Sequence, residues 1–398
     1  MLPLHGLKVI DLSSVVFGPY CAQWLADLGA DVIKLEAPEG DSTRQTGPGL
    51  EPGMAALFIG CNRSKRGLVL DLKTPEGQAA LDRLLATADV LLHSIRPQKL
   101  ASLGLEPAAL LARHPRLVFA GLHGFGEAGP YGGMPAYDDV IQGMSGIADL
   151  MARSTGEPRY MPTIIADKVS GLTAGIAILA AIVRRQTTGK GGFVEIPMFE
   201  TMVAFNFVEH FYGHHFEPPL GPLGYPRVMA PWRRPFATSD GHICMMAYTD
   251  AHWRGFFAVA GAAAHLDDPR FASISTRTEH IDAIYAIAGA LLRERSTAEW
   301  LALLGETQVP CAKVIPLARL ESDPHLVATG FFAAVETPAG VMRFPGVPVL
   351  FDGERPPVSL PPRLGGDTRA VLAEAGFSDA DIAALLASRA ARQHGEAA

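Results

Sequence analysis

Residues 7–36 read LKVIDLSSVVFGPYCAQWLADLGADVIKLE, and this stretch decides the fold class. Short apolar runs at residues 7–12 and 31–36 predict two strands. Between them a helical pattern opens after Gly18 and ends at Gly29. Two strands joined through a helix form a βαβ unit, whose strands lie parallel in one sheet.

The same alternation continues along the chain. Further strands are expected at residues 68–72, 88–94 and 116–122, with helices starting at Pro75 and Pro107. Strands and helices that alternate with short links predict an α/β fold, in which a doubly wound, mostly parallel, Rossmann-like sheet forms the large domain. The pattern also predicts a helix over residues 137–150, a strand ending near Ile165 and a long helix over residues 168–186.

A stretch rich in Pro and Gly separates the predicted large domain from a smaller one. It includes the sequence EPPLGPLGYPRVMAPWRRP, which is typical of an interdomain linker. We therefore predict a large α/β domain over residues 1–210 that residues 330–398 complete, a linker over 211–234, and a small α+β domain over 235–329.

Composition favours a small-molecule substrate in the cytoplasm. The net charge of −7, without a basic block, argues against a nucleic acid or an anionic membrane as the main ligand. The four cysteines are far apart and form no C-x-x-C pair, which indicates a reducing compartment. We see no signal peptide at the N-terminus, and the longest apolar stretch, residues 169–183, is shorter than the roughly 20 residues that a membrane span needs.

Asp167 stands between the apolar segment YMPTII and the predicted long helix. An Asp at this place often caps a helix by accepting hydrogen bonds from free backbone amides. Alternatively, the helix N-terminus would keep the carboxylate ionised beside a substrate carbonyl. Such a carboxylate can attack a thioester and form a mixed anhydride, which divides one difficult transfer into easier steps. The local pattern leaves both interpretations open.

Several separated blocks, in order, resemble the class III coenzyme A transferases, the family of the formyl-CoA and carnitine types, which is related to the α-methylacyl-CoA racemases. The blocks are residues 7–44, NRSKRGLVLDLKTPEG at 62–77, GFGEAGPYGGMPAYDDVIQGMSG at 124–146, ADKVSGLTAGIAILAAI at 166–182, and residues 309–332 and 361–368. The resemblance implies that Asp167 is the nucleophile. It also implies CoA transfer from an acyl-CoA to a carboxylic acid through an aspartyl anhydride and an aspartyl-CoA thioester. It further implies an interlaced homodimer and no bound prosthetic group or metal.

The phosphates of CoA require cations and free amides. Loops at the carboxyl ends of parallel strands line the ligand crevice of such a sheet, which makes Lys73, Arg96 and Lys99 candidates. The resemblance supports Lys73 and Arg96 as CoA-binding residues and implies that Ser94 and Tyr137 bind CoA as well. The sequence here departs from the family's Glu-Asn-Phe-Arg-Pro-Gly, because His93 and Ser94 precede the Arg, so we expect a different adenine contact.

On the acyl side the resemblance singles out three residues for substrate binding. Val16 stands where formyl-CoA transferases carry an active-site Gln, which disfavours formate or oxalate. Asp138 follows Tyr137 at the spacing seen in the transferases. Arg44, in the segment GDSTR, is a candidate partner for a distal carboxylate, because a guanidinium binds a carboxylate through two bonds. We therefore expect a dicarboxylate acceptor, with succinyl-CoA as donor.

Two alternatives stay open, an acyl-CoA racemase or isomerase of the same fold and a non-catalytic CoA-binding relative. The racemases carry Gly-His-Asp where this chain has Ala136, Tyr137 and Asp138, so one base of their two-base pair is missing. A metal site at His210, His214 and His215 is disfavoured because no acidic third ligand stands out. A nicotinamide site is disfavoured because G-x-G-x-x-G is absent after the first strand.

Overall fold

The computed structural model describes residues 1–395. The chain divides into two compact units. Unit 1 comprises Met1–Ser145, Met161–Ala204 and the chain from Pro324 onward; unit 2 comprises Gly146–Tyr160 and Phe205–Asp323. Residues 146–160 and 205–210, which we expected in the large domain, therefore belong to unit 2. The predicted linker 211–234 also lies inside unit 2, and residues 324–329, expected in the small domain, belong to unit 1.

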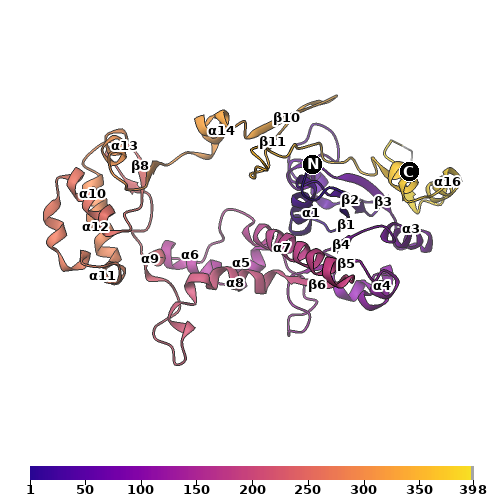
Figure 1. Cartoon of the computed structure of the whole chain (residues 1–398), viewed down its shortest axis with the longest axis horizontal. Coiled ribbons are helices and arrows are strands. Elements are labelled where there is room, and N and C mark those ends of the chain that lie inside the picture. Colours follow the sequence, from indigo (N-terminus) through magenta and orange to yellow (C-terminus); the bar gives the residue numbers. More distant parts are fainter. Residues whose placement is uncertain (396–398) are drawn as a thin grey trace. The chain divides into compact units, whose positions relative to one another are not determined.

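A seven-stranded sheet forms the centre of unit 1 (Figure 1). Its order is β12-β3-β2-β1-β4-β5-β6, and β12 alone pairs antiparallel with its neighbour. The strands are β1 (Lys8–Leu12), β2 (Asp31–Glu36), β3 (Arg66–Leu70), β4 (Val90–His93), β5 (Val118–His123), β6 (Gly192–Pro197) and β12 (Ala391–Arg392). The order reverses between β1 and β4, so the loops after these strands flank a crevice at the carboxyl edge of the sheet.

Helices cover both faces of this sheet. Ile10 and Ile33 point to the face where a leucine-rich core packs against α3 (Pro75–Leu85), α4 (Pro107–Arg113), α15 (Thr368–Glu374) and α16 (Asp379–Ala387). Since side chains alternate along a strand, Val9 and Val32 point to the other face. There α1 (Phe17–Asp27) packs against β2, and α7 (Ile165–Thr188) packs against α1, β5 and β6.

The rest of unit 1 covers the neighbourhood of α1. Helix α2 (Ala56–Asn62) packs against α1 and the 3-10 helix η1 (Ser42–Gln45). The hairpin of β10 (Phe332–Thr337) and β11 (Gly340–Pro345) brings Met342 and Phe344 against Phe58 of α2. Unit 1 also contains η2 (Pro97–Lys99), η3 (Ala101–Leu103), α5 (Asp138–Met144) and α14 (Pro324–Ala328).

Unit 2 is built around an aromatic core. Trp253, Phe256, Phe257 and Trp300 pack in it with aliphatic residues of α12. Its antiparallel sheet has the order β7-β8-β9, with β7 (Phe236–Ala237), β8 (His242–Met245) and β9 (Cys311–Lys313). Its helices are α6 (Ile147–Thr155), η4 (Tyr212–His215), α9 (Pro226–Met229), α10 (Asp250–Ala260), η5 (Ala263–Asp267), η6 (Pro269–Phe271), α11 (Ile274–Glu279), α12 (Ile281–Leu292), α13 (Thr297–Gly305) and η7 (Leu317–Ser322). Helix α8 (Met198–His210) begins in unit 1 and ends in unit 2.

Two expected elements were wrong. The helix predicted over residues 137–150 is broken at Gly146, whose φ of 91° is left-handed, so α5 ends before it and α6 starts after it. The strand predicted to end near Ile165 does not exist, because Ile165 is the first residue of α7. The polar backbone atoms of the preceding segment bind a side chain rather than a strand: Met161 N donates to Gln142 and Thr163 O accepts from it.

Helix α7 is longer than the sequence indicated. With 24 residues it is long and apolar enough to cross a membrane by length and composition alone. However, half of its apolar window is buried inside unit 1, and Asp167 and Arg185 on it are buried charged residues. The expectation of a buried helix thus agrees with its packing, while the length argument was wrong.

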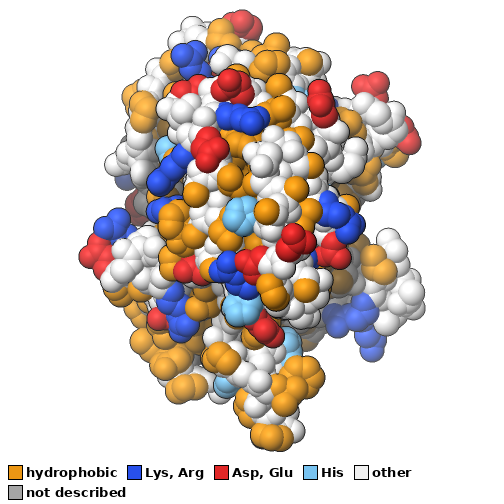
Figure 2. All heavy atoms as spheres, turned by 90° about the vertical axis from the view of Figure 1, so that its left-hand side faces the viewer, with side chains coloured by type: hydrophobic (Ala, Val, Ile, Leu, Met, Phe, Trp, Pro, Cys, Tyr) orange, Lys and Arg blue, Asp and Glu red, His pale blue; other side chains and the backbone are white. Residues whose placement is uncertain are grey.

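The face drawn in Figure 2 carries Lys and Arg side chains interspersed with Asp and Glu, with hydrophobic patches between them. Charges of both signs therefore lie close together on this face.

Candidate active site

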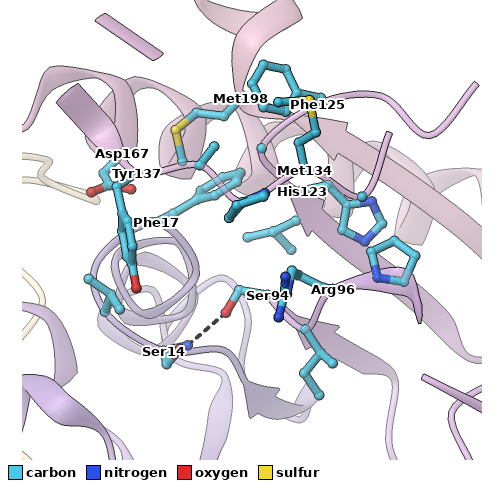
Figure 3. Close-up of a pocket in the computed structure, with 18 of the residues that line it drawn as sticks. Ser14, Phe17, Ser94, Arg96, His123, Phe125, Met134, Tyr137, Asp167 and Met198 are labelled. Atoms are coloured by element: carbon cyan, nitrogen blue, oxygen red, sulfur yellow. Dashed lines mark hydrogen bonds between the residues drawn. The ribbon is translucent and has the colours of Figure 1, made fainter. Parts of the chain in front are cut away.

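The site lies where the strand order reverses. The loop after β1 carries Ser13 to Val15, and the loop after β4 carries Ser94 to Arg96. The two loops are joined by a hydrogen bond of 3.0 Å from Ser14 N to Ser94 Oγ, drawn in Figure 3. This contact closes the switch point of the sheet and fixes both loops at one edge.

A cavity of about 350 Å³, which we call the nucleophile cavity, opens beside these loops. In Figure 3 Asp167, Tyr137 and Phe17 lie together on one side of it, while Ser94 and Arg96 lie on another. His123 and Met134 also line it. The cavity therefore brings together the predicted residues Asp167, Tyr137, Ser94 and Arg96, which come from three separate stretches of sequence.

Asp167 is the third residue of α7 and is 7% exposed. Its side chain caps nothing. Asp138 caps the helix instead, since its Oδ1 accepts from Ala166 N at 2.7 Å and from Asp167 N at 3.2 Å. The capping interpretation of Asp167 is therefore wrong. Within residues 1–395 no donor forms a hydrogen bond to the Asp167 carboxylate, so it faces the cavity unpartnered.

The protonation of Asp167 differs from our expectation. Burial, and after it the negative charge of Asp138, raise the pKa of Asp167 to about 7. We expected the helix N-terminus to keep this carboxylate fully ionised. The helix dipole acts in that direction, but the loss of hydration and the like charge oppose it. Near neutral pH the side chain is therefore divided between the acid and the carboxylate.

Asp138 and Gln142 form a buried network under the start of α7. Gln142 Nε2 donates to Asp138 Oδ2 at 2.6 Å and to Thr163 O at 3.2 Å. Because both oxygens of Asp138 are occupied by protein donors, the structure gives this residue a capping and orienting role rather than the predicted contact with substrate. Sequence reasoning did not single out Gln142. Its spacing of four residues from Asp138 on α5 could have indicated that the two side chains interact.

Two other predicted substrate contacts lie elsewhere. Val16 is buried as the N-cap residue of α1, and its neighbours Val15 and Phe17 line the nucleophile cavity instead. Arg44 is also buried and is fully engaged. Its Nε donates to Glu36 Oε1 at 2.8 Å, its Nη1 and Nη2 donate to Pro362 O, and its guanidinium covers the ring of Phe58. Arg44 thus ties η1 to the C-terminal part of unit 1, and it has no donor left for a substrate.

A second cavity of about 260 Å³, the leucine cavity, follows the carboxyl ends of β1, β2 and β3. Its walls include Leu12, Leu35 and Leu70, and Lys73 stands among its lining residues. Ser14 and Ile95 line both cavities, so the two adjoin at the switch point. Lys99, the remaining predicted CoA contact, is exposed on η2 and lines neither cavity.

A buried histidine pair lies at the ends of β4 and β5. His93 Nδ1 accepts from Ile95 N, and the rings of His93 and His123 are 5.6 Å apart. Burial, and after it the charge at His123, lower the pKa of His93 to about 3, so His93 is neutral. His93 is therefore part of the sheet rather than of an adenine contact. In the sequence, His93 in place of the family's Glu had indicated that the adenine contact differs here.

Potential metal ligands gather at one place in the described chain. Atoms of His123, Glu127 and Glu195 lie within 4.8 Å of one another. His123 Nδ1 is 3.3 Å from Glu195 Oε1, which also accepts from Glu127 N. These hydrogen bonds account for the cluster without an ion. Of the histidines singled out in the sequence, His210 Nδ1 accepts from a backbone amide, and the rings of His214 and His215 pack against Phe211.

Comparison with known proteins identifies the family. The model described as CoA-transferase family III matches residues 4–368. The chain belongs to this family. It is an enzyme of the CoA-transferase type, and the predicted family is confirmed.

Curated CoA-transferases match along nearly the whole chain. The succinate–glutarate CoA-transferase of Agrobacterium fabrum is 32% identical, over 94% of this chain and 95% of its own. The formyl-CoA:oxalate CoA-transferase of Escherichia coli is 30% identical, over 96% of this chain and 98% of its own. The crystal structure of Rv3272 from Mycobacterium tuberculosis superposes with a TM-score of 0.81 at 29% identity, covering 93% of this chain and 99% of that one.

Proposed function

We propose that this family III CoA-transferase moves CoA from an acyl-CoA to a free carboxylic acid, with Asp167 as the nucleophile. One observation carries the proposal: the Asp167 carboxylate is buried, accepts no hydrogen bond within the described chain, and faces a cavity at the switch point. A carboxylate without hydrogen-bond donors is poorly stabilised as an anion, which makes it a better nucleophile.

The two adjoining cavities support a path for CoA. The leucine cavity offers apolar walls for the adenine ring, and Lys73 lies among its lining residues, where a phosphate would find a cation. Past Ser14 and Ile95, Arg96 provides a second cation, and the nucleophile cavity leads to Asp167. The thioester of a bound acyl-CoA would then meet the carboxylate. The chain needs no metal or prosthetic group for this chemistry.

The transfer balances without a net proton or electron. An oxygen of Asp167 attacks the thioester carbonyl, the C–S bond breaks, and an aspartyl anhydride and the CoA thiolate result. The thiolate attacks the Asp167 carbonyl carbon and the donor acid leaves, giving an aspartyl-CoA thioester. The acceptor carboxylate then attacks this thioester, and the returning thiolate cleaves the new anhydride to release acyl-CoA and restore Asp167.

The acceptor we propose is a small dicarboxylate, with succinyl-CoA as donor. Support comes from the relative named for succinate and glutarate, which matches almost the full chain. Arg44 no longer supports it, because Glu36 and Pro362 use its donors.

The covalent step is tested by trapping. Incubation with succinyl-CoA should give an adduct on the intact protein, and hydroxylamine should convert Asp167 to a hydroxamate that peptide mass spectrometry locates. Asp167→Asn should form no adduct and lose transferase activity. Asp149→Asn, an exposed acid on α6, is the matched control and should behave as wild type. Full activity of Asp167→Asn, or a hydroxamate at another residue, would reject the nucleophile.

We also propose a homodimer, interlaced as in the family, that is located in the cytoplasm. Leu172, Ile176 and Val183 form an exposed apolar stripe along α7, and Val140 on α5 is exposed as well. Apolar side chains in such a row favour burial against a protein partner. The four cysteines are free, which supports a reducing compartment.

A further inference from the structure

Unit 2 contains a cavity of about 680 Å³ that neither the nucleophile nor the CoA path uses. It lies between α9, the β7-β8-β9 sheet and α12. Arg227, Arg233 and Arg234 line it, together with Phe236, Met245 and Tyr285. We call it the arginine cavity. Its walls thus combine three cations with apolar surface, which is the composition of a site for an amphipathic anion.

The charge of this cavity is not balanced by the protein. No Asp or Glu lines it, and none of its three arginines forms an ion pair with any residue of the described chain. Arg227 donates only to neutral atoms, Tyr285 Oη at 3.4 Å and Met246 Sδ at 3.2 Å. The guanidinium of Arg234 stacks on the ring of Trp232, 4.9 Å from its centre. Three like charges around one hollow repel each other unless an anion joins them.

The basic lining extends beyond the cavity. An adjoining hollow of about 250 Å³ shares Arg234 and Phe236 with it and adds His242 and Arg293, again without a carboxylate. Arginines on an open surface are often merely solvated. Arg233 and Arg234 are exposed at the rim of this cavity, but its floor is buried: Tyr285 is 6% exposed, and burial raises its pKa, so its hydroxyl keeps a proton. Because Tyr285 Oη accepts from Arg227, that proton is free to be donated.

We propose that the arginine cavity binds a small organic dianion with a carboxylate at each end of a short methylene chain. This assignment rests on the proposed function, whose acceptor belongs to the same class of molecule. Guanidinium groups bind carboxylates through two parallel bonds, so the arginines suit two carboxylates better than one. The walls formed by Phe236 and Met245 suit the methylene groups between them.

The test is a titration of the full-length protein with glutarate. Calorimetry and tryptophan fluorescence, to which Trp232 contributes, measure the binding. Valerate, which has the same chain length and one carboxylate, should bind at least about tenfold more weakly. The double variant Arg233→Gln/Arg234→Gln should weaken glutarate binding by about tenfold or more at an unchanged melting temperature. Arg254→Gln, an exposed arginine on α10 outside the cavity, is the control and should bind glutarate as wild type.

The outcomes separate the possibilities. Equal binding of glutarate and valerate, or unchanged binding by the double variant, would overturn the site, and tight binding of inorganic phosphate without glutarate would overturn the ligand class. Because this cavity shares no residue with the nucleophile cavity, the double variant should leave KM for glutarate and kcat unchanged in the basal reaction, as expected for an effector site. A raised KM for glutarate in the double variant would overturn the separation of the two sites. If the Asp167 adduct forms but glutarate does not bind, this inference alone fails; if no adduct forms in wild type, the proposed function fails.

Discussion

Asp167 stands at the start of α7, but it is free to act as the proposed nucleophile because Asp138 caps this helix. Asp138 accepts the amides of Ala166 and Asp167, which leaves the Asp167 carboxylate without a donor of its own. The same neighbour, together with burial, raises the pKa of Asp167 to about 7. One side chain therefore orients the helix and also adjusts the nucleophile.

This arrangement predicts the pH dependence of transfer. The carboxylate is the reactive form, so kcat/KM for acyl-CoA should rise with pH up to about 7, the pKa of Asp167, and level off above it. Asp138→Asn removes a negative charge and keeps an oxygen for the amides, so it should move this rise to lower pH. Glu209→Gln, an exposed acid on α8, should leave the profile unchanged. An identical profile in Asp138→Asn would show that Asp138 does not set this pKa.

The raised pKa also predicts a cost to stability. The pKa of Asp167 is about 7 when folded and near 3.8 when unfolded, so the unfolded chain loses this proton first as pH rises. The folded state is thereby destabilised between these two pH values, and the cost is complete above pH 7. Asp167→Asn should raise the free energy of unfolding at pH 8 by an amount on the order of a few kcal/mol. Urea denaturation should show this gain shrinking as pH falls toward 5, and a gain independent of pH would contradict the mechanism.

Sequence reasoning correctly located the residues whose position depends only on the end of one strand. Ser94 and Arg96 line the nucleophile cavity because a loop after a parallel strand faces the ligand edge of the sheet. It failed for Arg44 and Asp138, whose partners depend on the tertiary fold. The partner of Arg44 at Pro362 is 318 residues away along the chain, so no local pattern reveals that the guanidinium is occupied.

At the scale of elements, the loop from β1 to α1 is held by buried charges. Val15 has a φ of 71°, a left-handed conformation that a β-branched residue seldom adopts. Val15 N donates to Asp41 Oδ2 at 3.2 Å, and Lys34 Nζ binds Ser13 O at 2.8 Å and Asp41 Oδ2 at 2.9 Å. This buried pair therefore fixes the wall of the nucleophile cavity that Val15 provides.

Removing one member of that pair should be costly. In Asp41→Ala, the fully buried Lys34 would lose its ion-pair partner at 2.9 Å, while the charges of Asp11 and Glu36 would still act on it. We therefore expect a loss of about 1–3 kcal/mol in the free energy of unfolding. Asp149→Ala breaks the exposed pair with Arg153 on α6 and should leave the unfolding free energy unchanged. Chemical denaturation compares the two. A small effect of Asp41→Ala would mean that water or another group compensates Lys34.

The elements that the sequence predicted well are those with strong apolar runs. Strand β2 has the predicted bounds, and β1 differs by one residue. The segment before α7 misled the prediction, because its apolar letters suggested a strand while its backbone binds Gln142. A side-chain partner from another helix leaves no periodic signal in the sequence.

For the whole molecule, the apolar stripe on α7 predicts how copies associate. Ile176 is 70% exposed in its middle. Ile176→Glu should shift the protein toward monomers in light scattering, because a buried charge without a partner is unfavourable. Leu317→Glu, which changes an 85% exposed leucine on η7, should not. A wild-type monomer, or an Ile176→Glu dimer, would reject this surface as the interface.

The stretch rich in Pro and Gly was read as a linker, but residues 211–234 lie inside unit 2, so composition alone did not locate the boundary between the units. The assignment of residues 146–160 to unit 2 was not predictable either, since it depends on the packing of α6 against α9. Helices α6 and α9 are distant in the sequence, and no local pattern in either one predicts that they pack together.

Because β12 is the last strand of the chain, the edge of the large sheet is completed only at the end of synthesis. Ala391 pairs with Leu70, and Leu372 and Ile382 belong to the core that covers the same face of the sheet. These residues leave the ribosome after all of unit 2 has been made. Until then β3 presents an unpaired edge, and the leucine-rich face is covered by α3 and α4 but not by α15 and α16. We therefore expect a nascent chain that lacks residues 368–395 to depend on chaperones.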